Sequence, residues 1–302
     1  MNQELNCWIN VFKPKNLTSF DVIKKIRHRF KLKKIGHAGT LDPLAEGILP
    51  IAIGKTTKLI SLINNQIKSY EFEIKWGEQT STDDTEGDII NLSPKIPSDK
   101  EIISKLKNFE GEILQKPPKA SSVKINGERA YKLFRNKVIF ETKPKFVKVF
   151  NAKLISMSKK NISKFNIDCG KGFYVRSFAR DFAQFLNTRG HIYSLKRSKV
   201  GKFKEKNSIL LDDLLKISQM SQRIKGFYPS IFMLDDIPAL EVDKDEILQD
   251  IYHGKKVKIN FFNFTNSLNQ KEKNTYIVKK KDYVVSIGEI YEDYFKPKKV
   301  FL

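Results

Sequence analysis

Residues 36–50, GHAGTLDPLAEGILP, place one aspartate among three glycines and two prolines, with a histidine five residues before it. Such a stretch loses much backbone entropy on folding, because glycine gives up more conformational freedom than any other residue. Pro43 restricts Asp42 to an extended backbone. The stretch therefore predicts a tight loop that holds the Asp42 carboxylate close to another group, although an isolated loop aspartate more often forms a turn or caps a helix.

The charge balance points to a polyanionic partner. The 302 residues include 56 Lys and Arg against 34 Asp and Glu, which gives a net charge of +22. With 40% hydrophobic residues the chain can build a sizeable core, as one large domain or a large domain plus a small one. A folded chain this basic most often binds nucleic acid, but a biased genome also produces lysine-rich proteins.

Cysteine usage and the first residues predict a cytoplasmic protein. Cys7 and Cys169 lie far apart in apolar segments and lack a metal-type spacing, so we expect buried free thiols in a reducing compartment. The opening MNQELNCWINVF lacks the basic and then apolar pattern of a signal peptide. No apolar run in the sequence approaches the roughly 18 residues that span a bilayer.

Hydrophobic periodicity predicts mixed helices and strands. Thr18 or Ser19 is expected to cap a helix, and Ser98 begins a capping box with Glu101. Expected strands are 7–12, 49–53, 68–76, 145–157 and 162–169; expected helices are 20–30, 56–63, 174–186 and 209–217, with one more beginning after Ser98.

Composition shifts near residues 226–238, and a small β-rich module is expected beyond them. It would contain a helix at 244–252 and strands at 275–279, 284–290 and 300–302. The predicted fold class is α+β, with a mixed, mainly antiparallel sheet flanked by helices and a small β-rich C-terminal module.

Four stretches of the sequence, one of which contains the opening loop, carry a resemblance to a known family. They are WINVFKPKNLTSFDVIKKI (8–26), GHAGTLDPLAEGILPIAIGKTTK (36–58), KSYEFEIKWGEQTSTDDTEGD (68–88) and CGKGFYVRSFARDFA (169–183), the last followed by LKRSKVGKF (195–203). In this order they resemble the TruB-type tRNA pseudouridine-55 synthases over roughly residues 8 to 217. Asn16 departs from the glycine of many relatives, but asparagine tolerates the left-handed conformation, so we expect the turn to be kept.

The resemblance implies a domain organisation. Residues 1–230 would form the pseudouridine synthase catalytic domain, in which residues 116–145 are an insertion that clamps RNA. Residues 238–302 resemble a PUA-like RNA-binding module. The basic run at residues 24–34 leads into the aspartate loop and would contact phosphates, although a charge run is most often a solvated face.

The resemblance also implies the reaction. Uridine at position 55 in the T-loop of tRNA would be flipped out, its C1′–N1 bond broken, the uracil turned and a C1′–C5 bond formed. Nothing is oxidised and no group is lost, so no cofactor or metal is expected. Asp42 would be the catalytic carboxylate. The residues leave open whether it attacks C1′, attacks the base or assists proton removal from C2′.

Arg176 and Tyr70 match two further catalytic residues of the family. Arg176 would pair with Asp42 and keep the carboxylate ionised, whereas the amphipathic pattern alone would make it a solvated helix residue. Tyr70 would pack on the flipped uracil and serve in proton transfer, whereas strand alternation alone would make it a core residue.

The remaining site residues belong to the base pocket in this interpretation. Tyr174 and Leu195 would line it, although both also fit a core position. His37 would enter the space that the base vacates. Asp84 would join the charged network, with Asp83 as a rival in the run DDTEGD.

Other chemistries fit the sequence less well. Gly54-Lys55-Thr56 is not a P-loop, because the motif requires glycine where Leu49 stands, and the four histidines lack zinc-ligand spacing. The alternative function is a non-catalytic tRNA-binding or RNA-folding chaperone on the same scaffold, which would need no Asp42. We expect the T-arm of tRNA as partner, no membrane and a monomer.

Overall fold

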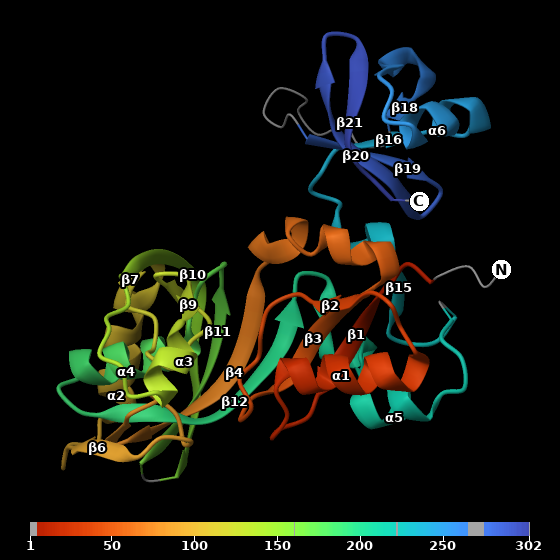
Figure 1. The fold of residues 1–302 in the computed structure, drawn as a ribbon. Coiled ribbons are helices and arrows are strands. Elements are labelled where there is room, and N and C mark those ends of the chain that lie inside the picture. Colours follow the sequence, from red (N-terminus) through yellow and green to blue (C-terminus); the bar gives the residue numbers. More distant parts are fainter. Residues whose placement is uncertain (1–4, 160, 222, 265–274, 302) are drawn as a thin grey trace.

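The computed structural model describes residues 5–159, 161–221, 223–264 and 275–301. These residues form an 11-stranded sheet with helices packed on it and a 6-stranded sheet near the C-terminus (Figure 1). The predicted α+β class is confirmed. No helix within the described ranges is long and apolar enough to cross a membrane.

The large sheet is mixed but mainly antiparallel. Its order is β14-β1-β3-β12-β4-β11-β10-β7, with β2 on β3, β13 on β12 and β15 on β1; only the β1–β14 and β3–β12 pairs among these described strands are parallel. The strands are β1 (Cys7–Lys13), β2 (Ile35–His37), β3 (Glu46–Ile53), β4 (Lys68–Trp76), β7 (Gly111–Gln115), β10 (Lys145–Lys159), β11 (Ile162–Cys169), β12 (Gly190–Val200), β13 (Phe203–Lys204), β14 (Ile209–Leu210) and β15 (Phe227–Pro229).

Helices and short hairpins complete the fold. The α-helices are α1 (Ser19–Phe30), α2 (Asp99–Leu106), α3 (Ala130–Arg135), α4 (Val175–Phe185), α5 (Leu211–Lys216) and α6 (Asp245–Tyr252), and the hairpins are β5 (Glu78–Thr80) with β6 (Ile89–Leu92) and β8 (Lys124–Ile125) with β9 (Glu128–Arg129). Short 3₁₀ helices are η1 (Gly54–Leu59), η2 (Leu62–Asn65), η3 (Lys107–Phe109), η4 (Glu205–Asn207), η5 (Ser230–Met233) and η6 (Ile259–Phe261).

An aromatic core fixes α4 on the sheet. Phe72 of β4 stacks on Phe165 of β11 with 5.5 Å between ring centroids, and meets Phe178 of α4 edge-on at 5.7 Å. Phe182, one turn further along α4, packs on Phe178 and Trp76. Because side chains two apart on a strand share a face, β4 directs Tyr70 to the same side as these aromatic residues.

Local signals set the first helix and the turn before it. Thr18 caps α1, and it forms a reciprocal capping box with Asp21. Asn16 has φ 63°, so it keeps the left-handed turn that was expected from an asparagine in a glycine position. The cysteines are free and buried, as predicted.

Two element predictions in the large domain were wrong in part. Residues 56–63 do not form an α-helix; η1 and η2 replace it, and Thr57 Oγ1 donates back to the carbonyl of Gly54 at 2.8 Å. That local hydrogen bond competes with α-helical pairing. Residues 209–210 extend the sheet as β14, because they pair with β1, so α5 begins only at Leu211.

The C-terminal sheet has the order β17-β21-β20-β19-β16-β18. Its strands are β16 (Ala239–Glu241), β17 (Val257–Lys258), β18 (Asn263–Phe264), β19 (Thr275–Lys280), β20 (Tyr283–Tyr291) and β21 (Tyr294–Val300). A strand was predicted at 300–302, but the last strand, β21, ends at Val300. Leu302 lies outside the described residues. The sheet shares a buried cluster with the large sheet, in which Trp8 and Ile48 join Ile277 and Ile287.

Candidate active site

Asp42 lies in the connection between β2 and β3, which we call the aspartate loop (residues 38–45). The Ser19 hydroxyl at the start of α1 accepts from the Leu41 N–H at 2.8 Å and donates to the Leu41 carbonyl at 3.1 Å. The Ala45 N–H donates to the Asp42 carbonyl at 3.1 Å. Contacts on both sides thus hold the backbone at Asp42 in place.

Gly47, just after this loop, allows β3 to approach β12. Its φ is 110°, and a Cβ atom there would lie 2.2 Å from the carbonyl oxygen of Arg197. Backbone atoms cannot give way as a flexible side chain does. The glycine is therefore required by the parallel pairing of Gly47 with Arg197.

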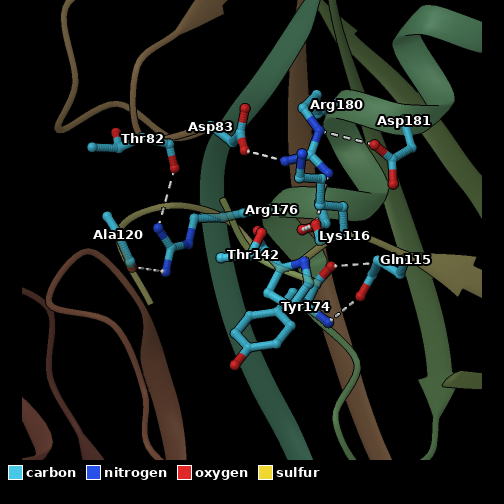
Figure 2. Close-up of polar contacts among 12 residues, drawn as sticks. Thr82, Asp83, Gln115, Lys116, Ala120, Thr142, Tyr174, Arg176, Arg180 and Asp181 are labelled. Carbon is cyan, nitrogen blue, oxygen red and sulfur yellow. Dashed lines mark hydrogen bonds and ion pairs between the residues drawn. The ribbon is translucent and has the colours of Figure 1, made fainter. Parts of the chain in front are cut away.

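Arg176 forms an ion pair with Asp42. Its Nε lies 2.9 Å from Asp42 Oδ2, and the Arg176 side chain is 5% exposed while that of Asp42 is 33% exposed. The Nη1 atom donates to the Thr82 carbonyl at 3.1 Å and Nη2 to the Ala120 carbonyl at 3.0 Å (Figure 2). The guanidinium is thus buried, and each of its nitrogens has a polar partner. The Asp42 carboxylate, in contrast, is partly exposed to solvent.

Asp84 provides a second carboxylate to the same arginine. Its Oδ2 lies 3.4 Å from Arg176 Nη1, and its Oδ1 accepts from the Thr82 hydroxyl at 2.5 Å and the Glu86 N–H at 3.0 Å. Burial raises the pKa of Asp84, and the Arg176 charge and these hydrogen bonds oppose that rise. Of the two aspartates left open by the sequence, Asp84 lies on Arg176, whereas Asp83 pairs with Arg180 at 2.8 Å.

Tyr70 is buried on β4 and lies within the electrostatic reach of Asp42. Burial raises the pKa of its hydroxyl. The charge of Arg197 and a hydrogen bond with its side chain oppose that rise. The phenol is therefore neutral at physiological pH.

Arg197 is a site residue that the sequence reasoning missed. It is 1% exposed, and its Nε donates to the Ile48 carbonyl at 2.7 Å. Its Nη2 donates to the Gly39 carbonyl at 2.9 Å and Nη1 approaches the Thr40 carbonyl at 3.4 Å. The guanidinium thus joins the start of the aspartate loop and strand β3 to Tyr70. The only signal in the sequence was its place in the LKRS stretch.

Lys13 is a second residue that was missed. It is fully buried, and its Nζ donates to the carbonyls of Leu17 at 2.6 Å, Pro14 at 2.9 Å and Pro43 at 3.4 Å. Burial lowers the pKa of Lys13 to about 8, although the nearby Asp42 carboxylate favours its charged form. This lysine ties the first turn of the chain to the residue that follows Asp42.

The other predicted residues surround this centre at different depths. His37 ends β2; burial, with the charge of Arg197, lowers its pKa, and among described residues its buried Nδ1 has no hydrogen-bond partner. Tyr174 precedes α4, and burial raises its pKa. Leu195 is 5% exposed on β12, opposite Phe72, so most of its surface belongs to the core.

An open cleft of about 550 Å³ lies beside this centre. Polar residues of the 81–88 loop form one wall, and the predicted insertion forms the other. Lys119, Arg135 and Lys137 line it, and Thr82 belongs both to the cleft and to the contacts of Arg176. Glu86 and Asp88 also line it, so the cleft has cations on the insertion side and carboxylates on the loop side.

Comparisons with known proteins identify related sequences over most of the chain. The family model described as TruB family pseudouridylate synthase (N-terminal domain) matches residues 27–175. The tRNA pseudouridine synthase B of Bartonella henselae is 38% identical over 303 residues, covering 97% of this chain and 95% of that protein. The enzyme of the same name from Ehrlichia ruminantium is 40% identical, covering 97% and 98%. That of a Wolbachia pipientis strain is 47% identical over 213 residues, which is 70% of this chain and 60% of that protein.

Solved structures share the fold. A chain of a Cbf5–Nop10–Gar1 complex superposes with a TM-score of 0.74 at 24% identity, covering 98% of this chain and 85% of that one. A chain of an H/ACA RNP bound to a substrate RNA containing 2′-deoxyuridine gives 0.73 at 21% identity, covering 98% and 85%. The fold is therefore that of pseudouridine synthases, and because curated relatives align at 38–40% identity over nearly the whole chain, the chain belongs to the TruB family of pseudouridylate synthases.

Proposed function

We propose that this chain isomerises uridine to pseudouridine at position 55, in the T-loop of tRNA. Its membership of the TruB family supports the reaction, and the names of its curated relatives support tRNA as the substrate. The observation that carries the proposal is the Asp42 carboxylate, part exposed and held 2.9 Å from a buried guanidinium.

The isomerisation needs an anionic group beside the sugar. The C1′–N1 bond breaks, the uracil turns, C1′ bonds to C5, and the proton of C5 leaves while N1 gains one. Asp42 is the group assigned to this step, because its exposed side can meet an incoming nucleotide. Arg176 orients the carboxylate and keeps its charge compensated in a buried setting.

The base pocket is assigned to residues around this pair. Extrusion of a stacked base costs a few kcal/mol, and stacking on an aromatic ring recovers about 1–3 kcal/mol. Tyr70 takes that stacking role and the proton transfer. Tyr174 and Leu195 line the pocket, and His37 fills the space left in the RNA.

Binding of the T-arm is assigned to three surfaces outside the pocket. The insertion at residues 116–145 closes over the RNA, and its walls in the cleft carry lysine and arginine. The basic run at residues 24–34 and the module at residues 238–302 bind the backbone further away. The enzyme acts as a monomer in the cytoplasm, where its tRNA substrate resides.

Incubation with an unmodified tRNA transcript tests the proposal. The wild-type chain, without added cofactor, should produce pseudouridine in the T-loop alone when the product is mapped by chemical derivatisation. Asp42→Asn should lower the rate by more than about 10³-fold, the scale on which loss of a catalytic nucleophile is felt.

Binding measurements separate the two candidate activities. Asp42→Asn should bind the transcript within threefold of wild type, because the charged surfaces remain. Full activity in Asp42→Asn would remove Asp42 from the mechanism. A wild-type chain that binds and refolds tRNA but forms no pseudouridine would favour the chaperone alternative instead.

A further inference from the structure

Two arginines on α4 divide two consecutive aspartates between them. Arg176 and Arg180 are four residues apart, and such residues lie on the same face of a helix. Arg176 pairs with Asp84 at 3.4 Å, and Arg180 pairs with Asp83 at 2.8 Å. Both aspartate side chains are buried, at 1% and 8% exposure.

The same two arginines hold the start of the insertion. Arg180 Nη2 donates to the Lys116 carbonyl at 2.8 Å, as does the Ser177 hydroxyl at 2.8 Å, and Arg176 Nη2 donates to the Ala120 carbonyl. Figure 2 shows Arg180 above Arg176, with Asp83 and Asp181 close to its guanidinium. One helix therefore holds both the polar 81–88 loop and the root of the insertion.

The backbone of Asp83 is left-handed, with a φ of 61°. Aspartate and asparagine adopt this conformation more often than other non-glycine residues. Its carbonyl accepts from the Ile192 N–H at 3.0 Å, so the backbone here is also tied to β12. The left-handed residue lets Asp83 face Arg180 while the next carboxylate, that of Asp84, faces Arg176.

We propose that Arg180 is a positioning residue for the catalytic ion pair, acting through Asp83 and the Lys116 carbonyl on the geometry of Arg176. Its hydrogen bonds go to Asp181, Asp83 and the Lys116 carbonyl, and not to Asp42. It holds the polar loop and the insertion root where Asp84 and Ala120 reach Arg176, so that placement of the insertion and alignment of Asp42 are linked. The inference rests on the proposed function, because the aligned step is pseudouridine formation.

The guanidinium geometry makes this role specific to arginine. Its three nitrogens take three partners in different directions: Nε takes Asp181, Nη1 takes Asp83 and Nη2 takes Lys116. A lysine supplies one compact charge and cannot hold all three. Loss of the cation would also leave the buried Asp83 carboxylate unpaired.

Two substitutions of Arg180 test the inference in the full chain. Single-turnover rates of pseudouridine formation at saturating unmodified tRNA should fall about 10- to 100-fold in Arg180→Met, more than the tRNA Kd rises, although the insertion that Arg180 holds also contacts the RNA. Arg180→Lys should lie between, because it keeps the pair with Asp83 only. Arg189→Met, whose arginine donates to the Thr188 carbonyl, is the matched control and should keep the wild-type rate.

A double variant distinguishes positioning from general destabilisation. Asp84→Asn and Arg180→Met both act on Arg176, so the combined variant should stay within threefold of the slower single variant. A combined loss equal to the product of the single losses would overturn the inference. So would a wild-type rate in Arg180→Met, or a loss confined to Kd.

Controls cover the folding of the variants and the wild-type reaction. Thermal melting of each variant identifies one that does not fold, and Arg180→Lys then carries the comparison with Asp84→Asn. A wild-type chain that forms no pseudouridine contradicts the proposed function. An active wild-type chain with unaffected Arg180 variants contradicts this inference alone.

Discussion

At the scale of single residues, the candidate site is a set of buried cations around one accessible carboxylate. Arg176, Arg197 and Lys13 are 4%, 1% and 0% exposed, and each donates to backbone carbonyls. Burying a charge is costly unless it is paired and hydrogen-bonded. Here backbone carbonyls accept hydrogen bonds from these cations, so the exposed side of the Asp42 carboxylate stays accessible.

Buried lysines near this site should make stability depend on alkaline pH. Burial lowers the pKa of Lys13 and of Lys68 to about 8, from an ordinary value of 10.5. Between these values the unfolded chain binds more protons at these lysines than the folded chain, so they make the free energy of unfolding rise with pH above about 8. Burial raises the pKa of Cys7 and Cys169 from 9.0 to about 12, which opposes that rise above pH 9. Urea unfolding at intervals from pH 7 to 9 therefore measures the slope due to the lysines.

A variant identifies the source of that slope. Lys13→Met should be less stable than wild type by about 1–3 kcal/mol at pH 7, because buried carbonyls lose their donor. Its stability should also rise less steeply above pH 8. A slope identical to that of wild type would show that Lys13 does not titrate in this range.

At the scale of elements, one helix and one close strand pair create the site. Aromatic packing of Phe178 and Phe182 fixes α4 on the sheet. This brings Arg176 into ion-pair distance of Asp42. The β3–β12 pair brings Arg197 to the aspartate loop, and it exists because Gly47 has no side chain. Neither element carries the site alone.

Two glycine substitutions separate backbone strain from steric conflict. Gly47 and Gly111 both have positive φ, at 110° and 85°, but only at Gly47 would a Cβ atom meet backbone, that of Arg197. Gly111→Ala should cost about 1–2 kcal/mol of stability, the cost of a left-handed residue. Gly47→Ala should cost more than about 3 kcal/mol and lower the rate, since β12 must move.

Chemical denaturation and single-turnover kinetics check both glycine variants. Equal destabilisation of the two would mean that β12 moves away without cost. In that case the close approach of β3 and β12 does not hold Arg197 in place.

At the scale of the whole molecule, the charge of +22 and the shared core of the two sheets are the main features. Trp8 and Ile48 of the large sheet pack with Ile277 and Ile287 of the C-terminal sheet. Lys58 also donates to the Val300 carbonyl at 2.8 Å. The division at residues 230 and 238 stays a prediction, but the parts on either side of it share buried surface.

Binding of tRNA should weaken steeply with salt. Each phosphate that a lysine neutralises contributes about one unit to the slope of log affinity against log salt. Lys24 and Lys25 are exposed on α1, which begins beside the aspartate loop. Replacement of both with glutamine should reduce the slope by about one to two units, measured by filter binding from 50 to 300 mM KCl.

The control for the salt measurement is a lysine with a structural partner. Lys164 pairs with Glu71 at 3.6 Å, and Lys164→Gln should leave the slope unchanged. A slope that is flat in wild type, or unchanged in the Lys24 and Lys25 double variant, would contradict the assignment of α1 to phosphate binding.

The sequence by itself determined most of the longer helices and strands and named the main residues of the candidate site. Alternation of residues 68–76 predicted β4 with its bounds, and the start of α1 was predicted to within a residue, with Thr18 and Ser19 both open as its cap and Thr18 found to be the cap. These signals are local, because strand and helix periods involve residues only two to four apart. The motifs named Asp42 and Arg176, which the structure brings together, and left Asp83 and Asp84 as rivals.

Only the tertiary structure decided which polar residues are buried and what they hold. Arg197 contacts Gly39 across 158 positions of the chain, and Arg176 contacts Thr82 across 94. Such contacts follow from the order of strands in the sheet and from the packing of α4 against it. Neither can be read from the helix or strand periodicity of a short stretch of sequence. The burial of Lys13, the division of Asp83 and Asp84 between two arginines, and the role proposed for Arg180 all depend on that long-range packing, because a charge is tolerated inside a protein only where distant backbone and side chains converge to pair with it.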